Sequence, residues 1–113
     1  MTPFDLVLLP FPFTDLRTTR QRPCVVLAAF QPEGLPKHYV VAMVTSNLSG
    51  LAFPGDTELG RWSEAGLPKP SLVRLAKVVT VESSLIRKKL GTLEAADRRA
   101  VRHQFRHVFS ELV

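Results

Sequence analysis

The sequence contains only one cysteine, Cys24, so the chain cannot form an internal disulfide or a zinc site with several cysteine ligands. No apolar run approaches the roughly 18 residues that a membrane-spanning helix needs. The apolar stretch from Phe4 to Phe13 is interrupted by an aspartate and two prolines, and it lacks a basic n-region. We therefore expect no signal peptide, no membrane association and a cytoplasmic location.

Common catalytic and cofactor-binding patterns are also missing. The six glycines are scattered, which excludes a glycine-rich phosphate loop. His103 and His107 have the spacing of two metal ligands on a helix, but Gln104 stands where a metalloprotease has glutamate, and no third ligand is near. We interpret both histidines as surface or structural residues. His38 belongs to no Ser-His-Asp pattern, and we expect no metal and no other cofactor.

The chain has 113 residues, of which 45% are hydrophobic. This length suits one domain, expected to span residues 1–113, with a core that needs no disulfide. The net charge is +5, and the excess lies in Val73–Gly91, which holds five basic residues and one acidic residue. Such a segment suits a polyanion or an acidic peptide. On charge alone, a solvated surface that keeps the protein soluble explains it equally well.

Most apolar segments have the length and composition of β-strands, being rich in valine, leucine and phenylalanine. The expected strands are Phe4–Phe13, Pro23–Phe30, His38–Ser46, Asp56–Leu59 and the pair Leu72–Ala76 and Val78–Val81, which forms one hairpin or one bent strand. Pro10 and Pro12 remove backbone donors and restrict the end of the first strand to an edge or a bulge. Polar loops are expected at Thr14–Arg22 and Leu48–Gly55.

The C-terminal segment has a helical period instead. Its apolar residues recur at steps of four, three and four, which places on one helical face Val101, Phe105, Val108 and Leu112. Gly91 and Thr92 mark the predicted start, with Thr92 as the N-cap, and Glu94 and Asp97 lie in the first turn, where the helix dipole favours acids. These elements predict a mainly β fold with a C-terminal α-helix, as a small barrel or a curled antiparallel sheet with helical cover.

Polar residues gather at the ends of the predicted strands. Thr14 and Asp15 follow the first strand, Arg22 precedes the second, Thr45 and Ser46 close the third, and Ser71 precedes the next. Arginine offers a phosphate a fixed fork of donors, and hydroxyls add shorter contacts to its oxygens. The same residue types also cap and form turns, so the pattern alone leaves both interpretations open. We expect Cys24 to pack in the core as a small hydrophobe.

Five segments together resemble one known family. They are PFPFTDL at Pro10–Leu16, QRPCVVL at Gln21–Leu27, VAMVTSN at Val41–Asn47, GLPKPSLVRLAKVVTV at Gly66–Val81 and LGTL at Leu90–Leu93. In this order and spacing they resemble the MazF/PemK family of toxin endoribonucleases from type II toxin-antitoxin systems, over nearly the whole chain. The resemblance implies an SH3-like barrel with a C-terminal helix, a homodimer, and metal-independent cleavage of single-stranded RNA.

The resemblance also implies roles for particular residues. Arg22 and Thr45 match the family's catalytic arginine and threonine by position within their motifs. The implied reaction is attack of the 2′-hydroxyl on the adjacent phosphorus, which leaves a 2′,3′-cyclic phosphate and a 5′-hydroxyl. Arg22 would stabilise charge on the phosphoryl oxygens and Thr45 would orient the phosphate. Asp15 is the nearest candidate for the general base, and capping of its loop is the alternative role.

Substrate bases are expected to lie against the loops Thr14–Gln21 and Leu48–Pro54, with basic groups along the RNA backbone. The residues expected to bind RNA or to support the site are Thr14, Asp15, Arg17, Arg20, Ser46, Lys69 and Ser71. Some relatives carry further charged residues in the first loop, whereas this one offers two arginines and no glutamate. The cleaved RNA sequence is therefore left open.

The same basic surface suits a protein partner. The resemblance implies a cognate antitoxin whose acidic, partly apolar tail covers the RNA groove. Two alternatives stand beside the nuclease: a non-catalytic toxin like the related CcdB, which poisons DNA gyrase, and a degenerate relative that binds RNA or antitoxin without cutting. Because fold alone does not fix function, the presence of both Arg22 and Thr45 is what favours the nuclease.

Overall fold

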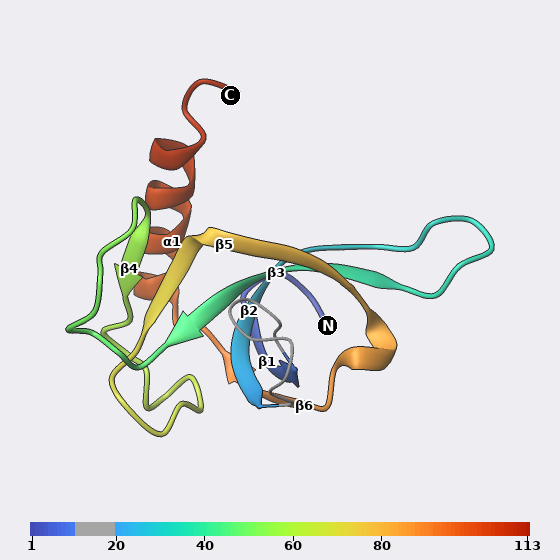
Figure 1. The fold of residues 1–113 in the computed structure, drawn as a ribbon, viewed down its shortest axis with the longest axis horizontal. Helices are drawn as coiled ribbons and strands as arrows, with labels where there is room; N and C mark the ends of the chain where they lie inside the picture. The colour runs from blue at the N-terminus through green and yellow to red at the C-terminus, as the bar shows by residue number, and fades with distance from the viewer. Residues whose placement is uncertain (11–19) are drawn as a thin grey trace.

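The computed structural model describes residues 1–10 and 20–113. In this part of the chain six strands precede one α-helix (Figure 1). The elements are β1 (Asp5–Pro10), β2 (Gln21–Phe30), β3 (His38–Thr45), β4 (Asp56–Glu58), β5 (Leu72–Glu82), the 3-10 helix η1 (Ser83–Leu85), β6 (Lys88–Thr92) and α1 (Ala95–Val108). The predicted mainly β fold with a C-terminal helix is confirmed.

The six described strands form one antiparallel sheet in the order β4-β5-β3-β2-β1-β6. The register shifts within three of the pairings, β1 with β6, β2 with β3, and β3 with β5. Such irregularities bend strands and increase their twist, and Figure 1 shows the sheet curled around itself. The strands at the two ends of this order, β4 and β6, do not pair with each other, so the sheet is curled but is not a closed barrel.

Both faces of the sheet are buried, because side chains alternate between two core clusters along the central strands. Leu6 and Val25 belong to the cluster that includes Val101 of α1. Val7 and Cys24, their neighbours in sequence, belong to the cluster on the other face. Cys24 is fully buried, which confirms its predicted packing role. The strands that carry the candidate site are therefore fixed from two sides.

The predicted helix start is wrong. Gly91 and Thr92 belong to β6, which pairs with β1, and the helix is capped instead by Glu94, whose side chain makes no capping hydrogen bond. The Thr92 hydroxyl donates to Asp5 Oδ1 at 2.8 Å. At Gly91 a Cβ would collide with the carbonyl oxygen of Ala65. The glycine therefore marks a close approach between two backbones, not the end of a strand-rich region.

The helical face is only partly covered. Val101 is buried, but Phe105 is 38% exposed, and Leu112 lies beyond the end of α1 and is 82% exposed. Figure 1 shows the second half of α1 rising away from the sheet. The buried Asp97 carboxylate holds the first turn, since it accepts the backbone N–H groups of Gly60 and Arg61, each at 2.9 Å.

Other boundaries follow the sequence closely. The two apolar runs before residue 82 form one bent strand, β5, which was one of the two alternatives. β2 begins at Gln21 and so includes Arg22, which the sequence pattern assigned to a loop. Pro10 ends β1, beyond the last β1 residue that pairs with β6, which agrees with its predicted edge position. In the described ranges, no helix is long and apolar enough to cross a membrane.

Candidate active site

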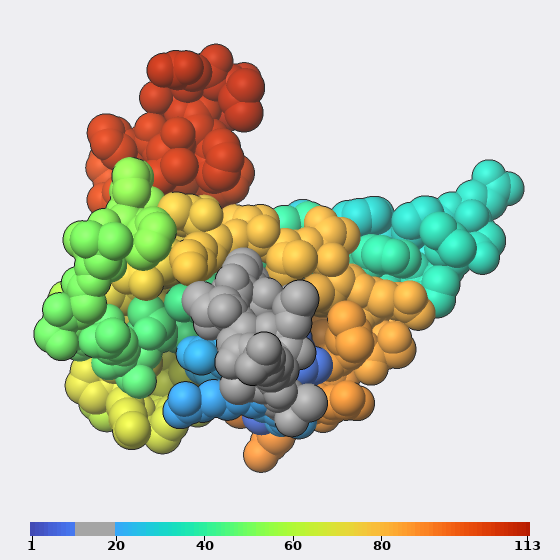
Figure 2. Space-filling view, viewed as in Figure 1, coloured from blue at the N-terminus to red at the C-terminus, as the bar shows by residue number. Residues whose placement is uncertain are grey.

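A cavity of about 320 Å³ lies where β2 begins and β3 ends. Its wall is formed by three segments: Arg20, Gln21, Arg22 and Pro23; Val44, Thr45, Ser46 and Asn47; and Leu67, Pro68, Lys69 and Ser71. Figure 2 shows these parts of the chain side by side on one face of the molecule. The structure thus brings together six of the predicted site residues, Arg20, Arg22, Thr45, Ser46, Lys69 and Ser71.

The sheet register explains why Arg22 and Thr45 meet. β2 pairs with β3 so that Cys24 lies opposite Met43. This is the last pair of the ladder at this end, and Arg22 and Thr45 each lie two residues beyond it. Both residues line the cavity. The pairing of β2 with β3 therefore brings to one cavity two residues that are 23 positions apart in the sequence.

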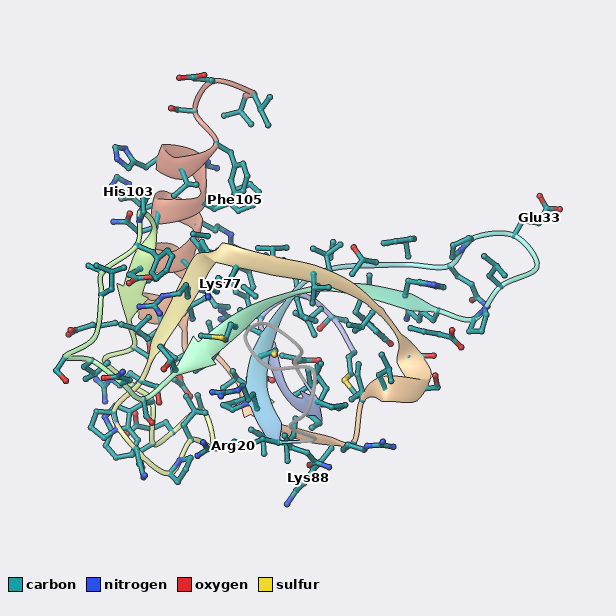
Figure 3. The ribbon with its side chains drawn as sticks, viewed as in Figure 1. Arg20, Glu33, Lys77, Lys88, His103 and Phe105 are labelled. Atoms are coloured by element: carbon teal, nitrogen blue, oxygen red, sulfur yellow. The ribbon has the colours of Figure 1, made fainter. Side chains whose placement is uncertain are left out.

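The cavity is cationic. Three basic side chains line it, from Arg20, Arg22 and Lys69, and none of the described residues that line it is acidic. In the described part of the chain, no hydrogen bond or ion pair occupies the guanidinium of Arg22, which is half-buried. Figure 3 labels Arg20 where the chain enters β2. Cations concentrated in a partly enclosed space attract anionic groups such as the phosphodiesters of a polyanion.

Thr45 contributes a hydroxyl group to the cavity wall. Its Oγ1 accepts the backbone N–H of Asn47 at 3.1 Å, a local bond that holds the side chain in place. A hydroxyl that accepts one hydrogen bond still has its own proton to donate. The Thr45 O–H is therefore available to a phosphate oxygen in the cavity. Ser46 is exposed beside it, and its carbonyl accepts the N–H of Leu48.

The third wall is a turn stiffened by Pro68 and Pro70, one on each side of Lys69. The hydroxyl of Ser71 donates to the carbonyl oxygen of Lys69 at 2.8 Å, and Ser71 itself is buried. Its carbonyl also accepts the N–H of Leu59. Ser71 thus holds the turn that presents the exposed Lys69 to the cavity, which makes it a supporting residue.

Three predicted site residues, Thr14, Asp15 and Arg17, lie outside the described residues. The structure adds Gln21 and Asn47, which line the cavity and were not predicted. Their only sequence signal is adjacency, since Gln21 precedes Arg22 and Asn47 follows Ser46.

The other reactive residues stand apart from this cavity. Burial raises the pKa of the Cys24 thiol strongly, and the nearby positive charge of Arg22 offsets only part of that effect, so Cys24 is a neutral core residue. His103 and His107 are exposed on α1, as predicted (His103 is labelled in Figure 3). Across residues 1–10 and 20–113, no three His, Cys, Asp or Glu side chains cluster as metal ligands.

A larger cleft, of about 410 Å³, lies between α1 and the N-terminal segment. It is lined by Pro3, Phe4, Leu27, Val101, Arg102, Phe105 and Arg106. Arginine is its only polar side chain, and the Arg102 guanidinium already lies over the Phe4 ring, 4.8 Å from its centroid. It lacks the hydroxyl and the amide that accompany arginine in the smaller cavity, so size alone does not make it the stronger candidate.

The fold has close structural relatives. The chain is similar to toxin MazF-mt6 of Mycobacterium tuberculosis, with a TM-score of 0.68 and 17% identity over 94% of this chain and 96% of that one. It is similar to an endoribonuclease in complex with its cognate antitoxin from a mycobacterial species, with a TM-score of 0.68 and 12% identity over 97% and 95%. It is also similar to the MazE-MazF structure from Deinococcus radiodurans, with a TM-score of 0.66 and 20% identity over 96% of this chain and 94% of that one.

No curated protein sequence matches the chain closely enough to count as a relative. A family model, however, matches residues 2–109, nearly the whole chain and all three walls of the cavity. The chain belongs to the family of PemK-like, MazF-like toxins of type II toxin-antitoxin systems.

Proposed function

We propose that this protein is an endoribonuclease toxin that cuts single-stranded RNA without a metal ion. The observation that carries the proposal is the cavity that Arg22 and Thr45 line together, with Arg20 and Lys69 in the same wall. Family membership and the structural likeness to an endoribonuclease support it. Cleavage of cellular mRNA would then inhibit translation and growth in the cytoplasm.

In the proposed reaction, the ribose 2′-oxygen forms a bond to the adjacent phosphorus and the bond from phosphorus to the 5′-oxygen breaks. The products are a 2′,3′-cyclic phosphate and a 5′-hydroxyl. Negative charge builds on the non-bridging oxygens in the transition state. The guanidinium of Arg22, which has no partner among the described residues, would stabilise this charge with two parallel donors. The partly enclosed cavity strengthens that interaction relative to bulk water.

Thr45 would orient the phosphate, because its hydroxyl proton is free while its oxygen is fixed by the Asn47 N–H. Two protons must also move: one leaves the 2′-hydroxyl and one reaches the 5′-oxygen. A guanidinium holds its proton tightly, so Arg22 is a poor base but a competent donor to a strongly basic alkoxide. Asp15 is our candidate for the base, since no carboxylate or imidazole lines the described cavity wall.

An antitoxin is the proposed regulatory partner. Relatives of this fold have been solved with their cognate antitoxins, as MazE-MazF and as the mycobacterial endoribonuclease complex. A cationic cavity without acidic residues would attract an acidic tail of the antitoxin as it attracts RNA. The two ligands would then compete. We also propose that the protein acts as a homodimer, which sedimentation at micromolar concentration checks directly.

The decisive experiment incubates the protein with mixed-sequence single-stranded RNA in EDTA and maps both fragment ends. We expect cuts at a recurring short sequence with cyclic phosphate ends, lost in Arg22→Ala and retained in Arg99→Ala. Arg99 is the matched control, because it is exposed on α1 and does not line the cavity. Intact RNA with folded wild-type protein would overturn the proposal, and cleavage that requires a metal ion would refute its metal independence.

A further inference from the structure

The loop between β3 and β4, residues 46–55, begins in the wall of the candidate site. Ser46 and Asn47 line the cavity, and Asn47 is tied to Thr45 through its backbone N–H. The side chain of Asn47 accepts a hydrogen bond from the Ser49 hydroxyl at 3.3 Å. The loop is therefore continuous with the candidate catalytic threonine at its first residues, and any movement of the loop reaches Thr45 directly.

The other end of this loop is held by Arg74 of β5. Its Nε and Nη2 donate to the two carboxylate oxygens of Asp56, at 3.1 and 3.0 Å, in the bidentate arrangement. Nη2 also donates to the carbonyl oxygen of Leu51 at 3.0 Å. The guanidinium lies over the ring of Phe53, 4.4 Å from its centroid. One side chain thus contacts the loop at two positions, Leu51 and Phe53, and also contacts Asp56, the residue that follows the loop.

Three features make this clamp rigid. Phe53 and Asp56 bond each other, through the Phe53 N–H to Asp56 Oδ2 and the Asp56 N–H to the Phe53 carbonyl. Both charged partners are largely withdrawn from solvent, which strengthens a correctly paired ion pair and makes its loss costly. At Gly55 the backbone is left-handed, with φ of +86°, and a Cβ would meet Val108 of α1, so the loop end is also packed tightly.

The hydrogen bond from Arg74 to the Leu51 carbonyl differs from the other hydrogen bonds of the loop. In the described chain it is the only hydrogen bond that joins residues 47–54 to a residue outside 45–56. Without Arg74, no hydrogen bond in the described chain would join Leu51 to the rest of the sheet. The arginine is placed to set the shape of the loop, and the core beneath does not require it.

The loop whose first residues line the cationic cavity also presents apolar groups to solvent. Leu51 is 79% exposed and Leu48 is 42% exposed. Exposed apolar side chains on such a loop are suited to an unstacked base, which presents a flat apolar face once it leaves the RNA stack. The basic cavity would hold the backbone while the loop contacts the base.

We propose that Arg74 is a positioning residue for substrate selection: it fixes the 46–55 loop in the shape in which Leu51 contacts one base of the RNA. The inference rests on the proposed nuclease function. Arg74 itself touches neither the cavity nor the reacting phosphate. Its effect passes through the Leu51 carbonyl and the Phe53 ring.

The test compares cleavage-site preferences of the full-length protein and five variants on a mixed-sequence RNA pool. Arg74→Met removes all donors and keeps the aliphatic stem, Arg74→Lys keeps the charge but not the fork, and Asp56→Asn removes the ionic partner. Leu51→Ala removes the proposed base contact without touching the clamp. Arg87→Met is the matched control, because Arg87 is exposed and lies outside both loop and cavity.

We expect Arg74→Met and Leu51→Ala to relax the preference at the same base position, by about tenfold, with kcat on the preferred sequence within threefold of wild type and KM raised. Arg74→Lys, the variant most certain to fold, should fall between wild type and Arg74→Met, with Asp56→Asn close to it. Relaxation at different positions, or an unchanged preference in folded Arg74→Lys and Arg74→Met, would overturn the role of Arg74. Absence of cleavage by wild type would instead refute the proposed function itself, and the role of Arg74 with it.

Discussion

Charged side chains serve two different purposes in this molecule. The carboxylates of Asp5, Asp56 and Asp97 are each satisfied by two or more partners, which join segments far apart in the sequence. In the cavity, by contrast, the side-chain nitrogens of Arg22 and Lys69 have no hydrogen-bond or salt-bridge partner within the described residues. Groups whose bonds are all made inside the protein hold the fold, and groups left without partners are available to a ligand. The difference predicts opposite responses to mutation.

The largest effect is expected at Arg22. Arg22→Ala should lower kcat/KM for RNA cleavage by about 10³-fold, or roughly 4 kcal/mol, which is typical for loss of a group that stabilises transition-state charge. Its Tm should change by only a few degrees, because no partner loses a bond. Steady-state kinetics and thermal unfolding check the two halves together. A large drop in Tm would place Arg22 with the structural charges instead.

Asp97→Ala should show the reverse. It leaves the N–H groups of Gly60 and Arg61 without their acceptor and should reduce the free energy of unfolding by about 3 kcal/mol. Glu94→Ala is the control on the same first turn, since the Glu94 side chain makes no capping bond, and it should cost less than about 1 kcal/mol. Urea unfolding measures both. Equal effects would contradict the anchoring role of Asp97.

The contribution of Asp5 to the stability of the fold depends on pH. Burial acts to raise the pKa of Asp5, but hydrogen bonds from the Thr2 N–H and the Thr92 hydroxyl, with the charge of Lys89, outweigh it and lower the pKa below its ordinary value of 3.8. The stabilisation is therefore complete above about pH 4 and is lost as the pH falls through the lowered pKa. Asp5→Asn should cost roughly 2 kcal/mol at pH 7.

Urea unfolding of wild type and Asp5→Asn between pH 2 and 7 checks this assignment. The difference in stability between the two proteins should shrink steadily below pH 4. A difference that is the same at every pH would show that the charge of Asp5 contributes nothing.

The smallest effect is expected at the two helix histidines. His103 and His107 are exposed and touch neither the cavity nor a buried carboxylate. Replacing both by alanine should change the free energy of unfolding by less than about 0.5 kcal/mol and leave cleavage unaltered. Loss of activity in that double variant, measured in the same RNA assay, would mean that α1 carries part of the site.

The sequence predicted that polar residues at the strand ends lie together, and six of them line one cavity. Arg22 and Thr45 were recognisable as polar residues beside apolar runs, and antiparallel pairing of neighbouring strands brings such ends together. Asn47 and Gln21 carry no distinctive chemistry, so only the geometry of the cavity singles them out. The clamp of Arg74 was equally hidden, because its partners lie 18 and 23 positions away.

Most strands were also predictable from their apolar runs, but β6 was not. Its sequence is KKLGT, and only Leu90 is a large apolar residue, so no alternating pattern announces a strand. Pairing with β1 and the close approach of Gly91 to Ala65 create it. Leu112 is the opposite case, in which the pattern predicted a buried helical residue. It continues the helical period, yet nothing in the described fold covers it. In both cases the presence or absence of tertiary contact, and not the local pattern, decided the structure.

Chemical labelling of Cys24 can report when the core below the site opens. It is the only cysteine of the chain, it is fully buried two residues after Arg22, and its thiol is held in the unreactive protonated form. An alkylating reagent can therefore modify the native protein only when the central strands separate. The labelling rate, followed by mass spectrometry, would time those openings without any engineered probe. A ligand that binds across β2 and β3 should slow it in proportion to its occupancy.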